Sequence, residues 1–371
     1  MSAGFVFTVY TDRDGIISRV WISGCVLSYI AVIFNITIFI VLCRKNLASP
    51  ATVLMQGLAI ADASTAFCAY GFEVLYQLKY LDNSFDESNT KLTMAYPYCA
   101  LYVHVSLCVD IFVMISTMLT LSLGIQKCLA LKFPLWTRSY LTKRHSIICC
   151  VVCLFVSCAI HIPRNFTIVE EASRADPNYC ITTYRNDRLL TYSSFHFIFI
   201  KTMLLSGFTF AMLFCTIHIV YRICTYKLRD QHKSRRVQER KSAVLVIMIM
   251  VIFLITAIPE IYLYILFCTE ITPDDKFYSL WNVENHKFAM TTIVSNKLKF
   301  LQQLERHTLT RWEIVLFVNE GRKMFSLIGC MTNSVIYFIM SEKLRNEFKL
   351  LCHRQRSKRN LNEKRHDHSG K

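Results

Sequence analysis

The sequence LAIAD at residues 58–62 places the carboxylate of Asp62 near the middle of an apolar run that extends over residues 50–75. The run is longer than the roughly 20 residues that a helix needs to cross a bilayer. An isolated charge in the middle of such a helix costs on the order of 3 kcal/mol or more. The Asp62 carboxylate therefore needs polar partners from other segments, which implies a bundle of helices packed around it.

Six further apolar runs accompany this one, and each has or approaches the length of a membrane span. The scattered polar residues inside several runs suit helices that pack against one another more than helices that face only lipid. The sequence therefore predicts an all-α membrane protein, built as a bundle of seven transmembrane helices. The runs cover residues 20–43, 50–75, 98–130, 146–162, 192–226, 242–267 and 312–340.

The charge of the chain is concentrated in particular segments. The 371 residues are 53% hydrophobic and 18% charged, with a formal net charge of +16. The segments after the first, third, fifth and seventh runs together carry +19, so the rest of the chain carries −3. Lys and Arg accumulate on the cytoplasmic side of membrane proteins, which places the N-terminus outside and the C-terminus inside. Topology thus explains the basic charge, and no nucleic-acid partner is expected.

Enzymatic chemistry is not indicated by any motif. The chain has no HExxH sequence and no Walker A loop. Most of the 16 cysteines lie inside apolar runs, where a cysteine behaves as a small buried apolar group. Cys150 and Cys153 have a CxxC spacing, but no second pair completes a zinc site. We expect neither an enzyme nor a metal centre of this kind.

Several motifs, in their order along residues 20–352, resemble those of the rhodopsin-like G-protein-coupled receptors. LAIAD is similar to that family's L-A-x-A-D motif, and Asn35 is placed like its helix-one Asn. Residues 333–337, NSVIY, resemble N-P-x-x-Y, and Pro259 is placed like the helix-six proline. The resemblance implies four parts: an extracellular N-terminus (1–19), a seven-transmembrane receptor domain (20–340), an amphipathic eighth helix (341–352) and a basic cytoplasmic tail (353–371).

The buried carboxylate of Asp62 has two candidate partners within these motifs, Asn35 and Asn333. We expect the three side chains to form an ion-and-water site in the core of the bundle, with sodium as the ion. The alternative is a protonated Asp62 that is hydrogen-bonded to its neighbours.

The outer halves of the predicted helices contain three acids, Glu73, Asp110 and Glu260. Together they would attract a cation, such as an Arg or an amine of a peptide. Tyr264 follows Glu260 by four residues, so the two share a helix face. The alternative is that each acid pairs with a local base such as Lys201 or Arg322. The predicted ligand-binding residues are Glu73, Asp110, Glu260, Tyr102 and Tyr264.

Further expectations concern covalent modification. Cys99 and Cys180 sit where the resemblance places an extracellular disulfide. Asn165 begins an Asn-x-Thr acceptor for glycosylation in an outer loop. Cys352 follows the predicted eighth helix beside basic residues, as palmitoylated cysteines do, although an unmodified Cys352 is the alternative.

The inner ends of the helices carry the residues expected to contact a G protein. Lys127 stands where the family has the Arg of D-R-Y. Tyr337 and Tyr221 are expected to turn into the cytoplasmic cleft, which Lys132 also lines. For most of the inner charges, topology and attraction to anionic membrane lipids are a sufficient explanation.

The chain departs from the family pattern at several positions. The D-R-Y motif reads Gln126-Lys127-Cys128, Ala257 replaces the helix-six Trp, and Ser334 replaces the helix-seven Pro. These changes bear on the activation switch and leave open a receptor-like protein that no longer couples.

The expected function is that of a multi-pass receptor in the plasma membrane that binds an extracellular peptide and activates a heterotrimeric G protein. Residues 162–166 and 125–127 resemble invertebrate receptors for FMRFamide, myosuppressin and sex peptide. A divergent nematode-type chemosensory receptor and, in another class, a channel or carrier are the alternatives. Residues 268–311 form a long outer loop to which no role is assigned.

Overall fold

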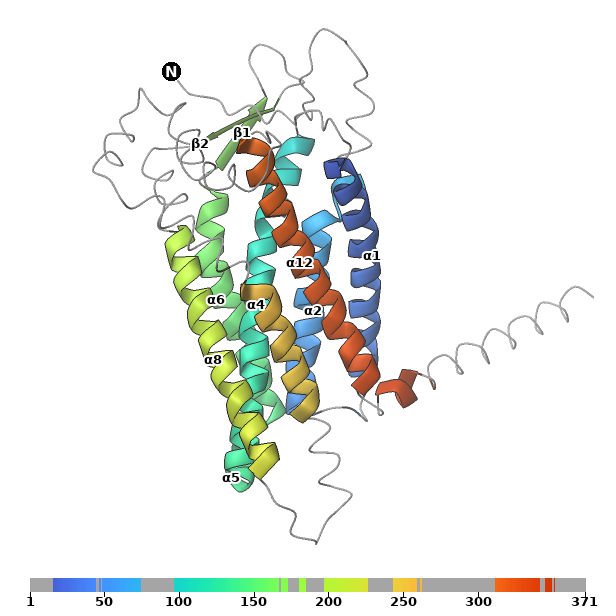
Figure 1. The fold of residues 1–371 in the computed structure, drawn as a ribbon, viewed down its shortest axis with the longest axis vertical. Helices are drawn as coiled ribbons and strands as arrows, with labels where there is room; N and C mark the ends of the chain where they lie inside the picture. Colours follow the sequence, from blue (N-terminus) through green and yellow to red (C-terminus); the bar gives the residue numbers. More distant parts are fainter. Residues whose placement is uncertain are drawn as a thin grey trace, which may run out of the picture.

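The structure is a computed structural model, and its described part is a bundle of long helices with one small hairpin (Figure 1). It describes residues 16–44, 47, 49–74, 97–166, 168–172, 180–184, 197–225, 243–258, 261, 311–340, 344–348 and 350. The long helices are α1 (Ile16–Leu42), α2 (Pro50–Tyr70), α4 (Tyr98–Lys132), α6 (Lys143–Asn165), α8 (Phe197–Thr225), the helix Ala243–Ile258 and α12 (Arg311–Met340).

These helices confirm the predicted all-α membrane domain. Five of them, α1, α2, α4, α6 and α8, are long and apolar enough to cross a membrane. The helix Ala243–Ile258 and the Lys323–Ile339 part of α12 are shorter apolar helices. The bounds of α1, α2, α4, α6, α8 and α12 lie within five residues of the predicted runs. The largest differences are at the end of α2, Tyr70, and at the start of α8, Phe197, whereas the sixth helix is described only as far as Ile258.

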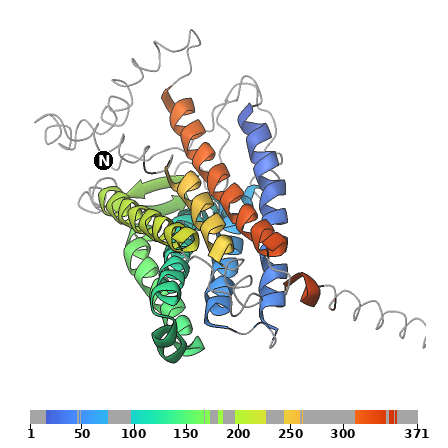
Figure 2. The same cartoon turned by 60° about the horizontal axis from the view of Figure 1, so that its bottom comes forward.

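The helix α4 lies at the centre of the bundle and packs against α2, α6 and α8. The helix α1 packs against α2 and α12. Figure 2 shows α12 between α1 and the helix Ala243–Ile258. The main apolar core joins these helices through buried side chains such as Leu58, Leu119 and Ile249. This arrangement brings α2, α4 and α12 together around the middle of the bundle.

The start of α2 shows how the local sequence sets a helix that matters for the site. The Ser49 hydroxyl accepts a hydrogen bond of 3.1 Å from the backbone N–H of Thr52. Pro50 occupies the first helical turn, where its missing N–H is not needed. The helix is thereby fixed from its first residue, twelve positions before Asp62.

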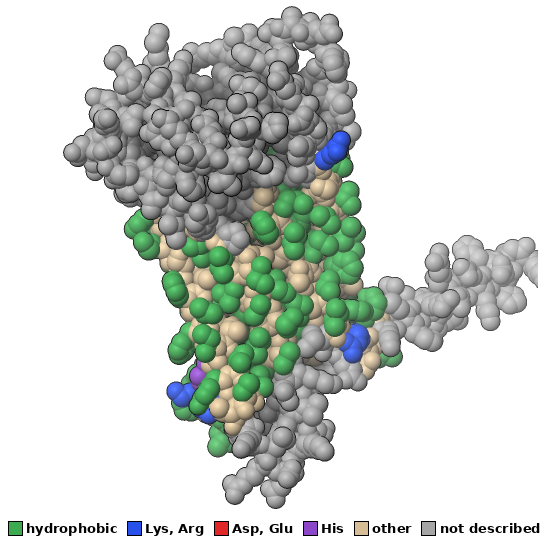
Figure 3. Space-filling view, viewed as in Figure 1, with side chains coloured by type: hydrophobic (Ala, Val, Ile, Leu, Met, Phe, Trp, Pro, Cys, Tyr) green, Lys and Arg blue, Asp and Glu red, His purple; other side chains and the backbone are tan. Residues whose placement is uncertain are grey.

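The lateral surface of the bundle is apolar, as a membrane-facing surface must be. Figure 3 shows hydrophobic side chains over the visible face, with Lys and Arg only near its two ends. Large hydrophobic side chains such as Phe155, Phe210 and Phe214 are about 70% exposed, which would be costly in water. The observation agrees with a bundle that lies in lipid.

Two elements lie at the ends of the bundle, and neither appears in the sequence prediction. The strands β1 (Ile168–Ala172) and β2 (Cys180–Tyr184) form an antiparallel hairpin in which Ala172 pairs with Cys180. The short helix α5 (Pro134–Tyr140) lies at the opposite end of the bundle (Figure 1). We refer below to the hairpin end and the α5 end.

Candidate functional site

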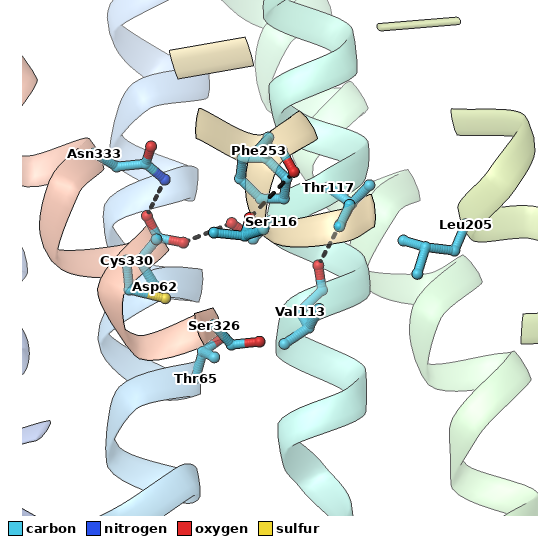
Figure 4. Close-up of a pocket in the computed structure, with 13 residues that line it drawn as sticks. Asp62, Thr65, Val113, Ser116, Thr117, Leu205, Phe253, Ser326, Cys330 and Asn333 are labelled. Atoms are coloured by element: carbon cyan, nitrogen blue, oxygen red, sulfur yellow. Dashed lines mark hydrogen bonds between the residues drawn. The ribbon is translucent and has the colours of Figure 1, made fainter. Parts of the chain in front are cut away.

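A buried polar network occupies the middle of the bundle, centred on Asp62. The Ser116 hydroxyl of α4 donates a hydrogen bond of 2.5 Å to Asp62 Oδ1. The Asn333 amide of α12 donates one of 2.9 Å to Asp62 Oδ2. All three side chains are buried, and Figure 4 shows Asp62 between the other two. The carboxylate thus joins three helices, as its position in an apolar helix requires.

Asn35 extends this network to α1, although it does not contact Asp62 directly. Its amide nitrogen donates to the backbone oxygens of Ala31, at 2.9 Å, and Cys330, at 3.3 Å. Its side-chain oxygen accepts a hydrogen bond of 2.7 Å from the Ser334 hydroxyl. The predicted grouping of Asp62, Asn35 and Asn333 therefore has two additional members, Ser116 and Ser334. Ser116 carries no motif that marks it in the sequence.

A small cavity of about 30 Å³ adjoins the network. Its volume suffices for one or two water molecules or a small ion. Asn333 Oδ1 is buried and makes no hydrogen bond within the described part of the chain. An oxygen of this kind, together with the Asp62 carboxylate and the Ser116 hydroxyl, is the donor set that a hard cation prefers. The polar residues lining the cavity include Asp62, Thr65, Ser116, Thr117, Ser326 and Asn333.

An ion pair connects α4 and α8 nearer the hairpin end. Lys201 Nζ donates a hydrogen bond of 2.8 Å to Asp110 Oδ1, and both side chains are buried. This is the alternative that the sequence left open for Asp110. The ligand-binding role of Asp110 stays a prediction, and any such role includes Lys201 as its neighbour.

Glu73 lies at the hairpin end, just beyond the last turn of α2. Its Oε1 accepts a hydrogen bond of 2.5 Å from the Tyr102 hydroxyl of α4. Two of the predicted ligand-binding residues, Tyr102 and Glu73, are thus in direct contact. Asp110 follows Tyr102 by eight residues, which is about 12 Å along the helix, so the two acids lie at different depths. Glu260 and Tyr264 lie outside the described residues.

A second buried ion pair on α12 was not predicted from the sequence. Lys323 Nζ donates a hydrogen bond of 2.8 Å to Glu320 Oε1. The Tyr70 hydroxyl donates to the Glu320 backbone oxygen at 3.1 Å, and Lys323 Nζ lies 5.6 Å from the centre of the Tyr70 ring. The three-residue spacing of Glu320 and Lys323 in an apolar run was the available signal.

The α5 end carries the residues predicted to contact a G protein. Tyr337 is 2% exposed, so its ring packs inside the bundle and does not face a cleft. Tyr221 is exposed on α8, and Lys127 is half-buried on α4. Lys132 is exposed, with Nζ 5.3 Å from the centre of the Phe133 ring. The stacked rings of Trp136 and Tyr140 on α5, 5.1 Å apart, add an exposed aromatic surface.

The modification sites are described only in part. Cys99 lies in the first turn of α4 and Cys180 begins β2, but their side chains lie outside the described set, so the disulfide stays a prediction. Cys352 is outside the described residues. Asn165 is the last residue of α6, half-buried, with its amide nitrogen 4.0 Å from the Cys108 sulfur.

This seven-helix arrangement around a buried carboxylate agrees with the comparison to known proteins. The profile of the family "7 transmembrane receptor (rhodopsin family)" matches residues 34–296. The chain belongs to this family. The receptor is therefore a multi-pass membrane protein of the G-protein-coupled class, with an extracellular ligand and a G protein as partners. The match ends before α12, so the contacts of Asn333 and Ser334 come from the structure alone.

The receptor is similar to named members of this family. The mouse Proto-oncogene Mas is 25% identical over 271 residues, which cover 70% of the receptor and 69% of Mas. Human Mas is 25% identical over 267 residues with the same shares. Proteinase-activated receptor 1 of Xenopus laevis is 26% identical over 179 residues, which cover 46% of the receptor and 39% of that protein.

Proposed function

We propose that the receptor binds a peptide at the hairpin end, on the outside of the plasma membrane, and activates a heterotrimeric G protein at the α5 end. The main support is the distribution of buried charge. Three acids, Glu73, Asp110 and Glu320, are buried in the half of the bundle nearer the hairpin. Exposed basic and aromatic side chains such as Lys132 and Trp136 lie at the other end.

The polar network around Asp62 is suited to connect these two ends. Ligand contacts that shift α4 or α12 would change the hydrogen bonds of Asp62 with Ser116 and Asn333. The buried ring of Tyr337, four residues after Asn333, would then exchange its place in the core for a place facing the G protein. A ligand acts in this way when it binds the second arrangement more tightly than the first.

The ligand class follows from the acids and from the sequence resemblance. A cationic group of a peptide complements buried carboxylates. The resemblance of residues 162–166 and 125–127 to FMRFamide, myosuppressin and sex-peptide receptors supports amidated peptides as the first probes. One relative is named a proteinase-activated receptor, so proteolytic activation is the second route to include.

The test uses the full-length receptor in cell membranes and measures nucleotide exchange on added G proteins. Amidated peptides form one set of samples, proteinase treatment another, and membranes without receptor the control. We expect a peptide to stimulate exchange and Lys127→Glu to reduce it at unchanged surface expression. Ion flux without nucleotide exchange would identify a channel or carrier. If well-expressed receptor gave no nucleotide exchange and no ion flux, that result would contradict the proposal.

We also propose that the cavity beside Asp62 binds a sodium ion. The support is Asn333 Oδ1, which accepts no hydrogen bond from the described residues and lies beside the Asp62 carboxylate and the Ser116 hydroxyl. A bound sodium ion would neutralise the negative charge of the Asp62 carboxylate. We expect sodium, compared with choline at equal ionic strength, to raise the unfolding temperature of the receptor. The Asp62→Asn variant should lose this difference, whereas an undiminished difference in it would exclude the site.

A further inference from the structure

The helix Ala243–Ile258, called the sixth helix below, lies between α8 and α12 in Figures 1 and 2. Its Met250 side chain is completely buried, whereas that of Met248, two residues earlier, is 44% exposed. Met250 belongs to an apolar cluster in which the sixth helix packs against both α4 and α8. It is therefore placed to hold the sixth helix against these two neighbours.

On α4, the Met250 side chain fits into a gap at Gly124. A Cβ atom at Gly124 would lie 2.6 Å from Met250 Sδ and 3.5 Å from Cys215 Cβ. The first distance is shorter than any ordinary contact of a Cβ atom, so the thioether occupies space that only a glycine leaves free. We call this gap the Gly124 notch.

The two helices that border the notch, α4 and α8, are joined to each other. The Cys128 thiol, about one turn after Gly124, donates a hydrogen bond of 3.5 Å to the Cys215 backbone oxygen. On α8, the Thr216 hydroxyl lies 3.8 Å from Met250 Sδ, within hydrogen-bonding range of a sulfur atom. Thioether sulfur is a weak acceptor, so the shape of the notch constrains Met250 more than this contact does.

A similar but looser contact joins the sixth helix to α12. A Cβ atom at Gly329 would lie 3.3 Å from Thr256 Cγ2, a distance that a shift of a few tenths of an ångström relieves. Thr256 follows Met250 by six residues, about 9 Å along the helix. The two contacts hold the sixth helix at two heights, and the closer fit is that of Met250 in the Gly124 notch.

We infer that Met250 positions the sixth helix in the resting receptor, because its thioether must leave the Gly124 notch before this helix can separate from α4. The inference rests on the proposed receptor function and names a contact that limits nucleotide exchange in the absence of ligand. Closely packed side chains have discrete arrangements, so the thioether is either seated in the notch or displaced from it. Ligand binding then favours the displaced arrangement.

The notch belongs to a segment in which the chain departs from the family pattern. Gly124 lies two residues before the sequence Gln126-Lys127-Cys128, which stands where the family has D-R-Y. The hydrogen bond between α4 and α8 uses the thiol of Cys128, the last residue of this sequence. The role of Met250 is therefore inferred from contacts of this chain's own residues.

The first test measures nucleotide exchange without ligand, using the full-length receptor in cell membranes and added G proteins. Gly124→Ala fills the notch, so it should favour the displaced arrangement and raise basal nucleotide exchange per surface receptor. The expected increase is roughly fivefold to thirtyfold, the population change that corresponds to the usual cost of overpacking. Gly207→Ala on α8 is the control and should leave basal exchange unchanged, because its added Cβ has no atom within 4 Å.

Substitution of the methionine itself gives the second test. Met250→Ala removes the side chain from the notch and should also raise basal nucleotide exchange, whereas Met248→Ala, at an exposed position of the same helix, should not. In Gly124→Ala/Met250→Ala the new methyl group meets no thioether, so basal exchange should lie below the product of the two single increases. A methionine that only stabilises the fold would give the opposite sign, with less nucleotide exchange when it is replaced.

Hydrogen exchange tests the contact without a G protein. In ligand-free receptor held in lipid nanodiscs, the amides of residues 243–258 should exchange faster in Gly124→Ala and Met250→Ala than in the wild type, because local opening becomes easier. If they do so and no ligand stimulates nucleotide exchange, the contact stands and the coupling proposal fails. Unchanged amide protection in both variants would overturn the inference. Unchanged or lower basal nucleotide exchange in a receptor that a peptide stimulates would also overturn it, and would leave the receptor function intact.

Discussion

Ser334 donates a hydrogen bond of 2.7 Å to the side-chain oxygen of Asn35, and this contact fastens α12 to α1. Both residues are buried. By sequence, Ser334 is a departure from the proline that the family has in N-P-x-x-Y. A proline side chain has no donor, so the serine makes a contact between helices that the family residue could not make.

The first prediction concerns this contact. Ser334→Ala leaves the Asn35 oxygen buried without a donor, which should destabilise the receptor by about 1–3 kcal/mol. Thermal unfolding in detergent measures the change. Thr332→Ala is the matched control, because the hydrogen bond that the Thr332 hydroxyl makes within the described part of the chain is to its own helix, at Ile328. Equal effects of the two substitutions would show that the contact with α1 contributes nothing.

The ion pair between Asp110 and Lys201 gives the second prediction. Asp110→Asn removes the carboxylate from a buried ammonium and should destabilise the receptor by about 3–5 kcal/mol. The double variant Asp110→Asn/Lys201→Gln removes both charges and should be more stable than Asp110→Asn alone. The unfolding temperatures of the wild type, Asp110→Asn, Lys201→Gln and the double variant form a double-mutant cycle. Additive effects would indicate that the two charges are not coupled.

Close packing between α1 and α2 gives the third prediction. A Cβ atom at Gly24 would lie 2.8 Å from the Tyr70 ring, whose hydroxyl holds the Glu320 carbonyl. Gly24→Ala should therefore destabilise the receptor by about 1–3 kcal/mol. Gly207→Ala is the control, because nothing lies within 4 Å of its added Cβ. That substitution should stabilise α8 by about 0.5–1 kcal/mol, the helical advantage of Ala over Gly. If Gly207→Ala were less stable than Gly24→Ala, the packing argument would be refuted.

Glycosylation of Asn165 gives the fourth prediction. The sequence places an acceptor there, whereas the amide nitrogen lies 4.0 Å from the Cys108 sulfur on α4. Attachment of a glycan requires this nitrogen to turn outward. We expect a glycosidase-sensitive mass shift that Asn165→Gln abolishes, with Asn35→Gln, inside α1, as the variant that leaves the shift unchanged. A wild-type receptor without the shift would mean that Asn165 keeps its place beside Cys108.

The bundle could be predicted from the sequence because long apolar runs, and a carboxylate in the middle of one of them, each have few structural solutions. The sequence was also sufficient for the contact between Asp62 and Asn333, since both lie in recognisable motifs. It was not sufficient for Ser116, because one serine in an apolar helix has no distinguishing pattern. The hydrogen bond between Glu73 and Tyr102 depends on how α2 and α4 are rotated, and periodicity alone does not fix that rotation.

The loop elements escaped prediction for a related reason. The strands β1 and β2 are only five residues each, and Glu170 and Glu171 in β1 interrupt any alternation of apolar and polar residues. The helix α5 has seven residues, too few for a periodic signal. Both α5 and β1 contact α4, and such contacts between elements leave no local pattern in the sequence.

The absence of proline from α12 has a mechanical consequence. The helix runs without a break from Arg311 to Met340, a length of about 45 Å. Glu320 near one end and Tyr337 near the other are therefore mounted on one rigid rod, about 25 Å apart along its axis. A rod without a hinge transmits rotation and sliding with little loss, whereas a kinked helix can absorb them by bending. In this receptor, a rotation of α12 at the hairpin end would rotate Tyr337 by the same angle.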